Sequence, residues 1–411
     1  MASASLAELA QVDITASRFK ANPFAFYARL RRDAPVFAVR VRGKQRAWLV
    51  TRYDEVLQVL KDDERFVKNR TLAMSKTQLA QAPRMPPMFK ALERNLLGLD
   101  GSDHTRLKAL VHQAFTPRMV EQMRELTTRV TSTTLDRAMR KGRVDLIADF
   151  ALPIPLTVIG LILGVPPEDN HKFKSWMAAF VSLGSRNPIF IIPSLLRFVR
   201  YLRRLIHSRR NEARDDLVSA LVTAQEGTDR LSDDEVLAMV FLLLSAGHET
   251  TVNLLATGVL ALLQHPTELN RLRSDPSLIK SAVEELARFV VPAEMATERY
   301  AMEDVAIGGA VIPKGEMVLA VIASANRYVS QFADPDRIDV GRDKNRHLSF
   351  GMGVHYCLGA PLSRMEAQIA LSALFERAPA IKLSVAPEQL QWREGLILRG
   401  LKSLPITLAA R

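Results

Sequence analysis

The chain has 411 residues, of which 48% are hydrophobic and 24% are charged, and its formal net charge is +12. This composition is typical of a packed globular protein and excludes an intrinsically disordered chain. The single cysteine, Cys357, excludes an intramolecular disulfide and a zinc site built from several cysteines.

The N-terminal segment and the longest apolar stretch both predict a protein that is not inserted into a membrane. The N-terminal segment carries Glu8 and Asp13 and has no apolar core of the kind that signal peptides contain. The apolar stretch 152–165 is interrupted by Pro153 and Pro155 and is shorter than the roughly 20 residues that a spanning helix needs. We therefore expect a cytoplasmic protein without a membrane anchor.

The excess of basic residues, 56 against 44 acidic ones, bears on the choice of partners. The basic residues are scattered and form no stripe interleaved with aromatic residues, so we expect no nucleic acid partner and keep DNA binding as a remote alternative. The charge favours solubility or the electrostatic steering of an acidic protein partner. Because the sequence has no internal repeat, low-complexity tract or Gly/Ser linker, we expect a single domain over residues 1–411.

Apolar residues three and four positions apart predict that most of the chain is helical. The predicted strands are few, and two pairs of them flank turns, one at Gly43 and one at Gly308 and Gly309. The Met- and Pro-rich segment 71–101 predicts a long loop, which in a compact domain is often functional, and 186–193 predicts a shorter link. The predicted helices include 54–60, 107–115, 120–139, 195–212 and 361–378, and the predicted strands are 36–41, 47–51, 305–307, 310–312 and 317–322.

One further predicted helix, 233–264, is long enough to cross the whole molecule. It begins with a capping box, in which the Ser232 hydroxyl accepts from the Glu235 N–H, and it ends before a His-Pro pair. At 1.5 Å per residue its length is roughly 48 Å. Its first third is almost continuously apolar and is expected to be buried, yet the polar run 247–251 follows directly. Buried polar groups are costly unless they have partners, so this run predicts a functional element.

The segment 347–360 carries the strongest chemical signal in the sequence. A thiolate that binds iron needs a tight, dry turn in which backbone N–H groups point at the sulfur, and three glycines in this segment supply the conformational freedom. A helix that begins near Ala360 favours negative charge on the sulfur of Cys357, and Phe350 can shield that sulfur from water. The alternative is a glycine-rich loop around an inert buried cysteine.

The residues from Phe350 to Gly359 match F-G-x-G-x-H-x-C-L-G, which resembles the haem-binding loop of the cytochrome P450 superfamily in its bacterial, soluble class. The resemblance covers essentially the whole chain. It implies a mainly α fold with a small β region, in which haem lies between a long central distal helix and the helix after the Cys loop. It also implies haem b (iron protoporphyrin IX) with Cys357 as the proximal iron ligand. Within the loop it assigns cofactor contacts to Phe350, Gly353, His355 and Gly359.

Glu285 and Arg288 resemble the E-x-x-R helix of the same family. On its own this spacing is more often an exposed pair worth a few tenths of a kcal/mol. The resemblance implies instead a buried structural ion pair, completed by Arg342, that holds the Cys loop in place and takes no part in the chemistry.

The polar run in the long helix resembles the family's A-G-x-[DE]-T-T segment. The resemblance implies that Gly247 lets the helix lie against the haem face, and that Glu249 relays protons from outside. Thr250 can bond a carbonyl one turn back and so open a groove for O2 and water. The alternative is a polar kink that is kept for packing.

Three positions resemble the family's partners of the haem propionates, namely His104, Arg299 and His355. Lys108 stands where the family usually has Arg, which puts a bidentate propionate contact at this position in doubt. The link between Arg288 and Arg299 is one residue longer than usual, so the sequence leaves open which of residues 293–296 faces the haem. If Glu294 faces inward, it could anchor a polar or cationic group of the substrate.

The resemblance implies a monooxygenase that inserts one oxygen atom from O2 into an apolar small molecule of the fatty acyl, terpenoid, steroid or macrolide and polyketide type. A G-x-G-x-x-G motif at Rossmann spacing is absent from the sequence, so we expect electrons from a separate acidic ferredoxin or flavodoxin with its reductase. We also expect a monomer. The candidate docking residues are Arg106, Lys108, Arg346 and Arg364, and the candidate pocket residues are 71–101, 181–193, Leu243, Leu244, 291–296 and 396–398.

Two alternatives to this function stay open at the level of sequence. The first is a haem-thiolate enzyme that uses peroxide, although Glu249 and Thr250 argue against it because peroxide needs no proton relay for O2. The second is a non-catalytic haem-binding sensor or carrier. Electron donor and peroxide, supplied to separate samples, would distinguish these possibilities.

Overall fold

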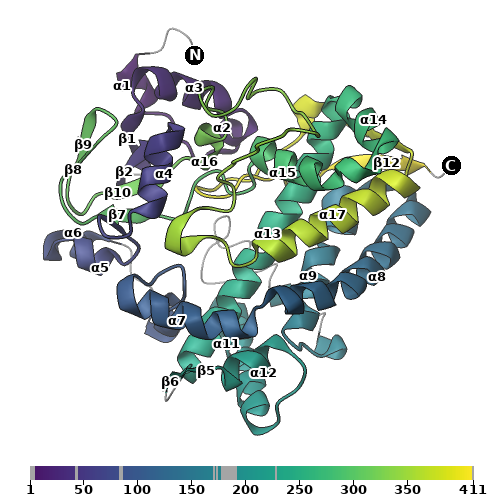
Figure 1. Cartoon of the computed structure of the whole chain (residues 1–411), viewed down its shortest axis with the longest axis horizontal. Helices are drawn as coiled ribbons and strands as arrows, with labels where there is room; N and C mark the ends of the chain where they lie inside the picture. Colours follow the sequence, from purple (N-terminus) through teal and green to yellow (C-terminus); the bar gives the residue numbers. More distant parts are fainter. Residues whose placement is uncertain are drawn as a thin grey trace.

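The computed structural model describes residues 5–41, 45–82, 87–169, 172, 175–176, 192–226 and 229–409. It confirms a mainly α protein with a small β region (Figure 1). The α-helices are α1 (Leu6–Leu9), α2 (Ser17–Ala21), α3 (Phe24–Asp33), α4 (Tyr53–Lys61), α5 (Arg70–Ala73), α6 (Lys76–Gln81), α7 (Gly101–Ala114), α8 (Pro117–Lys141), α9 (Pro153–Ile162), α11 (Ile192–Asn211), α12 (Leu217–Thr223), α13 (Asp233–Gln264), α14 (Pro266–Ser274), α15 (Ile279–Val290), α16 (Ile322–Ala325) and α17 (Ala360–Arg377). Shorter helical turns are η1 (Pro87–Glu93), η2 (Ile147–Ala151), η3 (Pro167–Asp169), η6 (Pro276–Leu278), η7 (Gly353–His355) and η8 (Pro387–Gln389).

The long helix α13 is the axis of the helical body and has the predicted bounds. The Ser232 hydroxyl accepts from the Glu235 N–H and the Glu235 carboxylate accepts from the Ser232 N–H, so both halves of the capping box are present. Helices α9, α11, α15 and α17 pack around α13 (Figure 1). Because α13 is surrounded on most sides, its apolar residues contribute to two of the three hydrophobic clusters of the core.

The strands form a five-stranded sheet in the order β1-β2-β10-β7-β3 and three smaller sheets. The predicted hairpins are confirmed, with Val36 opposite Val50 and Val305 opposite Ile312, although the turn at Gly43 lies outside the described residues. The strands are β1 (Val36–Val41), β2 (Gln45–Val50), β3 (Phe66–Val67), β4 (Arg143–Asp145), β5 (Gln225–Glu226), β6 (Asp229–Arg230), β7 (Arg299–Ala301), β8 (Val305–Ile307), β9 (Ala310–Ile312), β10 (Met317–Ala320), β11 (Ala380–Leu383) and β12 (Pro405–Ala409).

Three expectations about the elements were wrong at particular places. The segment 71–101 is not a single loop, since α5, α6 and η1 lie in it, and α6 is started by a capping box between Ser75 and Gln78. Residues 83–86 of that segment lie outside the described residues. The strand predicted to end at residue 322 ends at Ala320, because the chain turns there into α16. Helix α11 already begins at Ile192, inside the predicted link, and residues 186–191 lie outside the described part.

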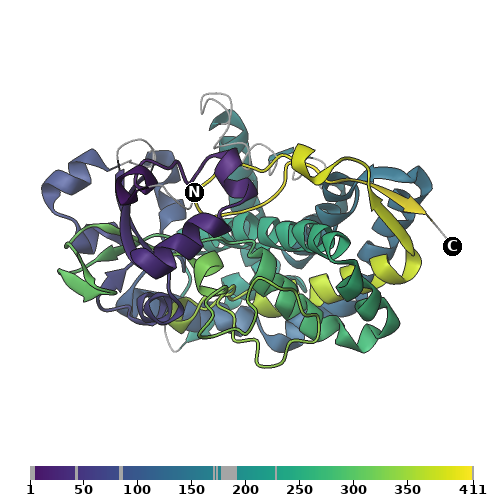
Figure 2. The ribbon, with the colours of Figure 1, turned by 90° about the horizontal axis from the view of Figure 1, so that it is seen from above.

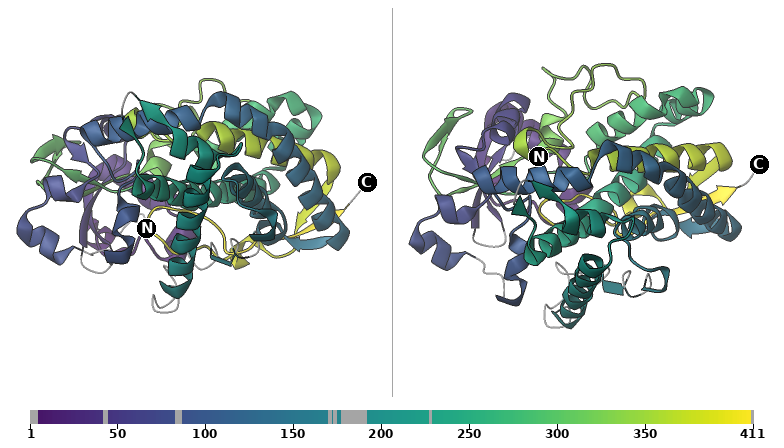
Figure 3. Two further views of the ribbon diagram at one scale, coloured as in Figure 1. Left: turned by 90° about the horizontal axis from the view of Figure 1, so that it is seen from below. Right: turned by 60° about the horizontal axis from the view of Figure 1, so that its bottom comes forward.

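The helical body lies between two sheets at opposite ends of the molecule (Figures 1 and 2). The five-stranded sheet with its β8–β9 hairpin lies at one end, and the sheet of β11, β12 and β4 lies at the other (Figures 1 and 2). Helix α17, which follows the Cys loop, packs along α8 and α13 (Figures 1 and 3). Among the described residues, α13 is the helix with the length and hydropathy to cross a membrane, and 61% of that apolar window is buried inside the protein.

Candidate functional site

A cavity of about 1250 Å³ lies where α13, the Cys loop and the C-terminal segment 393–402 meet. Its wall combines aliphatic side chains with a few polar groups, which is the usual make-up of a site for a cofactor or a small apolar molecule. The predicted site residues that line it are Gly247, Glu249, Thr250, Arg299, Phe350, His355, Cys357 and Gly359.

The Cys loop is folded tightly against the rest of the protein. The Cys357 N–H donates to the Phe350 carbonyl at 2.9 Å, which closes the loop. Gly353 has a φ of +73°, and a Cβ at this position would lie 2.7 Å from the Leu60 carbonyl oxygen, so only glycine fits. The loop leads directly into α17, whose N-cap is Gly359.

The Cys357 thiol is packed among protein groups but remains accessible from the cavity that it lines. Burial raises the pKa of the Cys357 thiol, while the backbone N–H groups of Gly359 and Ala360 and the nearby Arg364 guanidinium oppose this shift. A cysteine in such surroundings becomes a thiolate when a metal ion takes the place of its proton.

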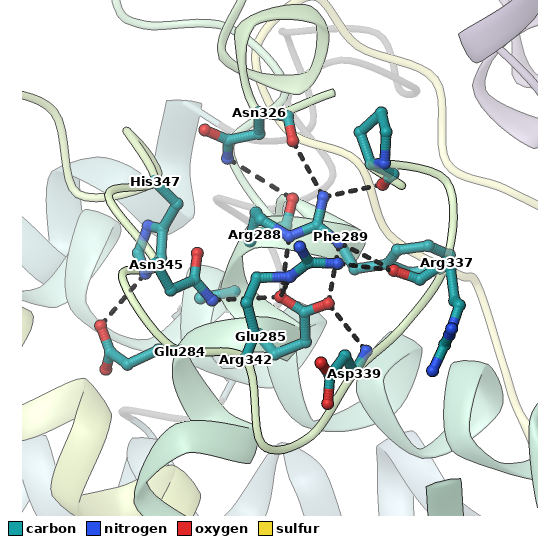
Figure 4. Close-up of polar contacts among 12 residues, drawn as sticks. Glu284, Glu285, Arg288, Phe289, Asn326, Arg337, Asp339, Arg342, Asn345 and His347 are labelled. Atoms are coloured by element: carbon teal, nitrogen blue, oxygen red, sulfur yellow. Dashed lines mark hydrogen bonds and ion pairs between the residues drawn. The ribbon is translucent and has the colours of Figure 1, made fainter. Parts of the chain in front are cut away.

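The predicted ion pair is present and fully buried (Figure 4). The Arg288 guanidinium donates to both carboxylate oxygens of Glu285, at 2.7 and 2.8 Å. Arg342 completes the group with a bond of 3.0 Å from its Nε to Glu285. Its remaining donors, like those of Arg288, go to backbone carbonyls of the segment 326–337, so the ion pair holds a long, irregular segment in place.

The connection from this ion pair to the Cys loop runs through Asn326, which the sequence analysis did not single out (Figure 4). Arg288 donates to the Asn326 carbonyl, the Asn326 side chain accepts from the Leu348 N–H at 2.8 Å, and its amide donates to the Ser349 hydroxyl. The Ser349 hydroxyl in turn donates to the Ala287 carbonyl. The start of the Cys loop is thus fixed to α15 by side chains that no sequence motif marks.

A second link to the Cys-loop helix is formed by Glu284, the neighbour of Glu285. Arg364 on α17 donates to both of its oxygens, at 2.7 and 2.8 Å. His347 lies at 3.1 Å from Glu284 (Figure 4). Although burial favours the protonated form, these two partners lower the pKa of Glu284 to about 2. The Arg364 guanidinium also lies 4.2 Å from the centre of the Phe350 ring, so it covers the aromatic residue that leads into the loop.

The polar run of α13 faces the cavity in part. Thr250 donates to the Ala246 carbonyl at 3.0 Å, one turn back, which confirms the predicted bond. The Glu249 carboxylate lies 3.2 Å from Arg393 of the C-terminal segment. His248, by contrast, is buried and bonded within the helix to Leu244, and Thr251 bonds Ser363 of α17. Part of the run therefore lines the cavity, and part of it packs against the rest of the protein.

Buried donors that lack partners gather at the edge of the cavity beside β7. Arg299 is 2% exposed, and its Nε and Nη1 atoms have no hydrogen-bond partner among the described residues. Burial, together with the nearby charges of Lys68 and Arg299, lowers the pKa of His355 to about 3. Neither ring nitrogen of His355 has a hydrogen-bond partner within the described residues. Burial and Arg299 lower the pKa of Lys68 to about 7. The unpartnered donors of the Arg299 guanidinium, next to the His355 ring, fit the two carboxylates of a haem.

Lys68 was not anticipated from the sequence, and it has a structural task as well. Its ammonium group donates to the carbonyls of Thr297 and Glu298, at 2.8 and 3.2 Å. These bonds hold the chain just before Arg299 next to β3. No sequence signal marks Lys68, because its position depends on the pairing of β3 with β7.

His104 and Lys108 lie behind the cavity wall and do not line the cavity. The His104 ring is 4.5 Å from the His355 ring between their centres, and the Lys108 ammonium donates to the Val354 carbonyl at 2.6 Å. Both side chains therefore brace the Cys loop from the side of α7. Gly353 also lies outside the cavity wall, where its turn is pressed against α4.

Glu294, for which the sequence left a contact with the substrate open, does not line the cavity. Its carboxylate is completely buried on the other side of the segment, 2.7 Å from the Lys20 ammonium and bonded to the Tyr27 hydroxyl. Its neighbours Ala293, Met295 and Ala296 line the cavity, which answers the question that the longer link left open. Separating this buried ion pair would leave Lys20 and Glu294 as single charges away from water, which is strongly destabilising. The pairing therefore keeps the Glu294 carboxylate away from the cavity.

The other predicted pocket residues are partly confirmed. Among the described residues of 71–101, Leu97 lines the cavity, and Leu243 lines it while Leu244 does not. The segment 396–398 lines it completely. Residues 181–191 lie outside the described residues.

Three of the four candidate docking cations have partners within the protein. Arg106 pairs with Asp229 and Glu235, Lys108 bonds Val354, and Arg364 pairs with Glu284. Arg346 is exposed, and its side chain has no ion pair within the described part of the chain.

Comparison with known proteins agrees with this site. The family model for cytochrome P450 matches residues 13–378. The polyketide biosynthesis cytochrome P450 PksS of Bacillus subtilis is 41% identical over 95% of this chain and 97% of its own length. Its solved structure covers 97% of this chain and all of its own, with a TM-score of 0.91.

Two further relatives extend the range of molecules that similar proteins handle. Mycinamicin IV hydroxylase/epoxidase of Micromonospora griseorubida is 42% identical over 92% of this chain and 94% of its own length. P450BioI, solved in complex with an acyl carrier protein that carries hexadec-9Z-enoic acid, has a TM-score of 0.85 at 35% identity and covers 95% of this chain and 99% of its own. The match of the family model, the identity of these relatives and the Cys loop at the cavity together show that this chain belongs to the cytochrome P450 family as a haem-dependent monooxygenase.

Proposed function

We propose that the protein binds haem b in the central cavity and oxidises an apolar small molecule there, as a single domain over residues 1–411. The observation that carries this proposal is the position of Cys357, which faces the same cavity as Glu249 and Thr250 of α13. A sulfur ligand on one wall and a carboxylate–hydroxyl pair on the opposite wall are what reductive activation of O2 requires.

The chain's own residues account for how the cofactor is held. Cys357 would hold the haem iron through its sulfur, and the N–H groups of Gly359 and Ala360 would stabilise the negative charge of the thiolate. Arg299 and His355 have free donors for the propionates, and His104 and Lys108 position the loop that carries His355. When bound, the haem supplies the activation of O2 and the transfer of one oxygen atom to the substrate.

The distal wall handles protons and water. The Glu249 side chain is 18% exposed and also lines the cavity, so its carboxylate can take up a proton at the edge and release it inside. The Thr250 hydroxyl, held by the Ala246 carbonyl, can pass on a hydrogen bond to a molecule in the cavity. Glu249 and Thr250 are therefore the proposed catalytic residues.

The cavity favours a sizeable apolar substrate of the polyketide, macrolide or fatty acyl class. Its wall next to the predicted haem position is built from aliphatic residues of α13 and of the segments 292–296 and 396–398. With Glu294 turned away, the carboxylates that line the cavity among the described residues are Glu249 and, at its edge, Glu394. The names of PksS, the mycinamicin hydroxylase and P450BioI support the same substrate classes.

Electrons have to come from a separate protein, and we propose an acidic ferredoxin or flavodoxin with its reductase, since the chain carries a net charge of +12. We further propose that the protein is monomeric and cytoplasmic. Size-exclusion chromatography of the haem-loaded protein tests the first of these two statements, and cell fractionation tests the second.

The decisive test replaces Cys357 by alanine. We expect Cys357→Ala to lose the red-shifted carbon monoxide band of the reduced protein, which a thiolate ligand produces, while Ser363→Ala on the helix that follows the Cys loop keeps it. If the band persists in Cys357→Ala, the ligand assignment is wrong. Turnover with peroxide but not with the electron donor system would establish the peroxide-dependent alternative, and haem binding without turnover would establish a carrier or sensor.

A further inference from the structure

Within the described residues, one ion pair joins α13 to the C-terminal segment, and it lies at the edge of the cavity. The Arg393 guanidinium donates to Glu249 at 3.2 Å, and the two side chains are 30% and 18% exposed. Both residues line the cavity. The pair therefore stands between bulk solvent and the space in which the reaction is proposed to occur.

Arg393 is held in its orientation by the backbone of its own segment. Its N–H donates to the Gly400 carbonyl at 2.9 Å, and its Nε donates to the Leu401 carbonyl at 3.1 Å. With two donors fixed to the backbone, the remaining end of the guanidinium points at Glu249. This contact is unlike a surface ion pair between two long mobile side chains, whose ordering cancels most of the electrostatic gain.

The segment that carries Arg393 is also pressed against α13. A Cβ at Gly400 would lie 2.0 Å from the Asn253 side-chain oxygen, so the two backbones approach closely one turn beyond Glu249. Isolated bridges from Trp392 to Leu401 and from Ala293 to Leu398 hold the segment in place. The separation between Arg393 and Glu249 is thus set by the packing of the fold.

The other charged groups around Glu249 are arranged differently. His248 on the same helix is buried and bonded to Leu244. Glu394 and Lys402 of the C-terminal segment line the cavity, but within the described residues neither forms an ion pair or hydrogen bond with Glu249. Glu366 of α17 lies next to Thr251. Within the part of the chain that the structure describes, Arg393 is the cation in contact with this carboxylate.

We propose that Arg393 is a positioning residue for proton delivery, which holds the Glu249 carboxylate at the boundary between solvent and cavity. This inference rests on the proposed function, because it assigns a task to Arg393 only if Glu249 relays protons. With Arg393 in place, the carboxylate is kept next to Thr250 and in reach of solvent. Without it, Glu249 is free to adopt other rotamers, and fewer of them connect the two sides.

The test is a double-mutant cycle on the haem-loaded protein, supplied with a [2Fe–2S] ferredoxin, its reductase and NADPH, with myristic acid as the probe ligand. The variants are Arg393→Gln, Arg393→Lys, Glu249→Gln and the double variant Arg393→Gln/Glu249→Gln. NADPH consumption and peroxide release are measured in H2O and in D2O, because these rates report proton delivery whether or not myristic acid is hydroxylated. A matched control, Arg129→Gln, removes an exposed ion pair with Glu125 on α8.

We expect Arg393→Gln to slow NADPH consumption by about 5-fold, which corresponds to roughly 1 kcal/mol. We also expect it to increase the solvent isotope effect. Arg393→Lys restores most of the rate, and Arg129→Gln equals the wild type. In the Glu249→Gln background, Arg393→Gln adds nothing further, since it acts through Glu249. The carbon monoxide spectrum and the melting temperature of each variant show that the fold and the haem site are intact.

The inference is overturned if Arg393→Gln leaves the rate and the isotope effect unchanged while Glu249→Gln alters them. It is also overturned if the two substitutions act additively, because Arg393 then works by another route. If Glu249→Gln itself has no effect, the proton relay of the proposed function has failed, and this result is distinguishable from the other two.

Discussion

Thr250 illustrates how one side chain can have a structural bond and a chemical task. Its hydroxyl donates to the Ala246 carbonyl, and the oxygen lone pairs stay available on the cavity side. Such a bond within a helix has a small effect on stability, because the hydroxyl only shares a carbonyl that is already bonded. The main consequence of removing it should be seen in the reaction.

We therefore predict that Thr250→Val reduces the product formed per electron while the consumption of reductant continues, because water and protons are no longer guided in the cavity. Peroxide or excess water takes the place of product. Oxygen uptake, peroxide and product are measured together. The control is Thr223→Val, which removes an equivalent hydroxyl bonded to the Ser219 carbonyl on α12. Full coupling in Thr250→Val would remove this residue from the mechanism.

At the scale of elements, α15 is the part that connects the core to the Cys loop. Two adjacent acidic residues on it reach different partners, Glu285 the buried arginines and Glu284 the helix α17. The sequence pattern E-x-x-R marks only the first of these contacts. The second depends on how α15 and α17 cross, which a one-dimensional spacing does not contain.

Glu285→Gln is predicted to destabilise the protein by about 3–5 kcal/mol, because it leaves two guanidinium groups buried without their carboxylate. Since Arg288 also fixes the segment that leads into the Cys loop, haem content should fall as well. Thermal unfolding and the haem-to-protein ratio are the measurements. Glu125→Gln, which removes a surface pair with Arg129, should change stability by at most about 1 kcal/mol.

The lowered pKa of Glu284 predicts that part of the protein's stability is lost at acidic pH. Its pKa is lowered to about 2 from the ordinary value of 4.5 for a glutamate, so its interactions contribute fully above pH 4.5 and are lost as the pH falls toward 2. The wild type should therefore be more stable than Glu284→Gln at neutral pH, by about 1–3 kcal/mol. This difference should shrink between about pH 4.5 and 2. A difference that is constant over this range would show that His347 and Arg364 do not stabilise the carboxylate.

On the scale of the whole molecule, charge and shape have separate roles. The excess of positive charge is distributed over the surface, and most basic side chains near the Cys loop are paired within the protein. Arg346, whose backbone carbonyl accepts from Tyr53, stays exposed next to the loop. A partner that docks there is attracted by the overall field and contacts only a few free cations.

We predict that the rate at which an acidic ferredoxin reduces the protein falls as ionic strength rises from about 0.01 to 0.15 M, since the screening length shortens from about 30 to 8 Å. Arg346→Gln should lower this rate and weaken its dependence on salt. Lys382→Gln, an exposed substitution on β11, serves as the control. Reduction by a neutral chemical donor should be unaffected in all three proteins. A salt-independent rate would contradict electrostatic docking.

The sequence by itself determined the class of fold and the central chemistry. The periodicity and the capping box of α13 set its bounds, and the loop around Cys357 predicted the proposed sulfur ligand, because both signals are carried by residues close together in the chain. Sequence patterns did not predict the structure where contacts with distant parts of the chain determine it. The segment 71–101 folded into short helices, and Glu294 turned to Lys20, 274 positions away.

Only the tertiary structure decided which distant side chains meet. Lys68 reaches Thr297 through a strand pairing, Asn326 connects α15 to the Cys loop, and Arg393 meets Glu249 across 144 positions. The physical reason is that burial, charge pairing and free donors depend on distances in space. A motif records the residues whose neighbours in the chain are also their neighbours in the fold, and the partners contributed by other elements leave no such record.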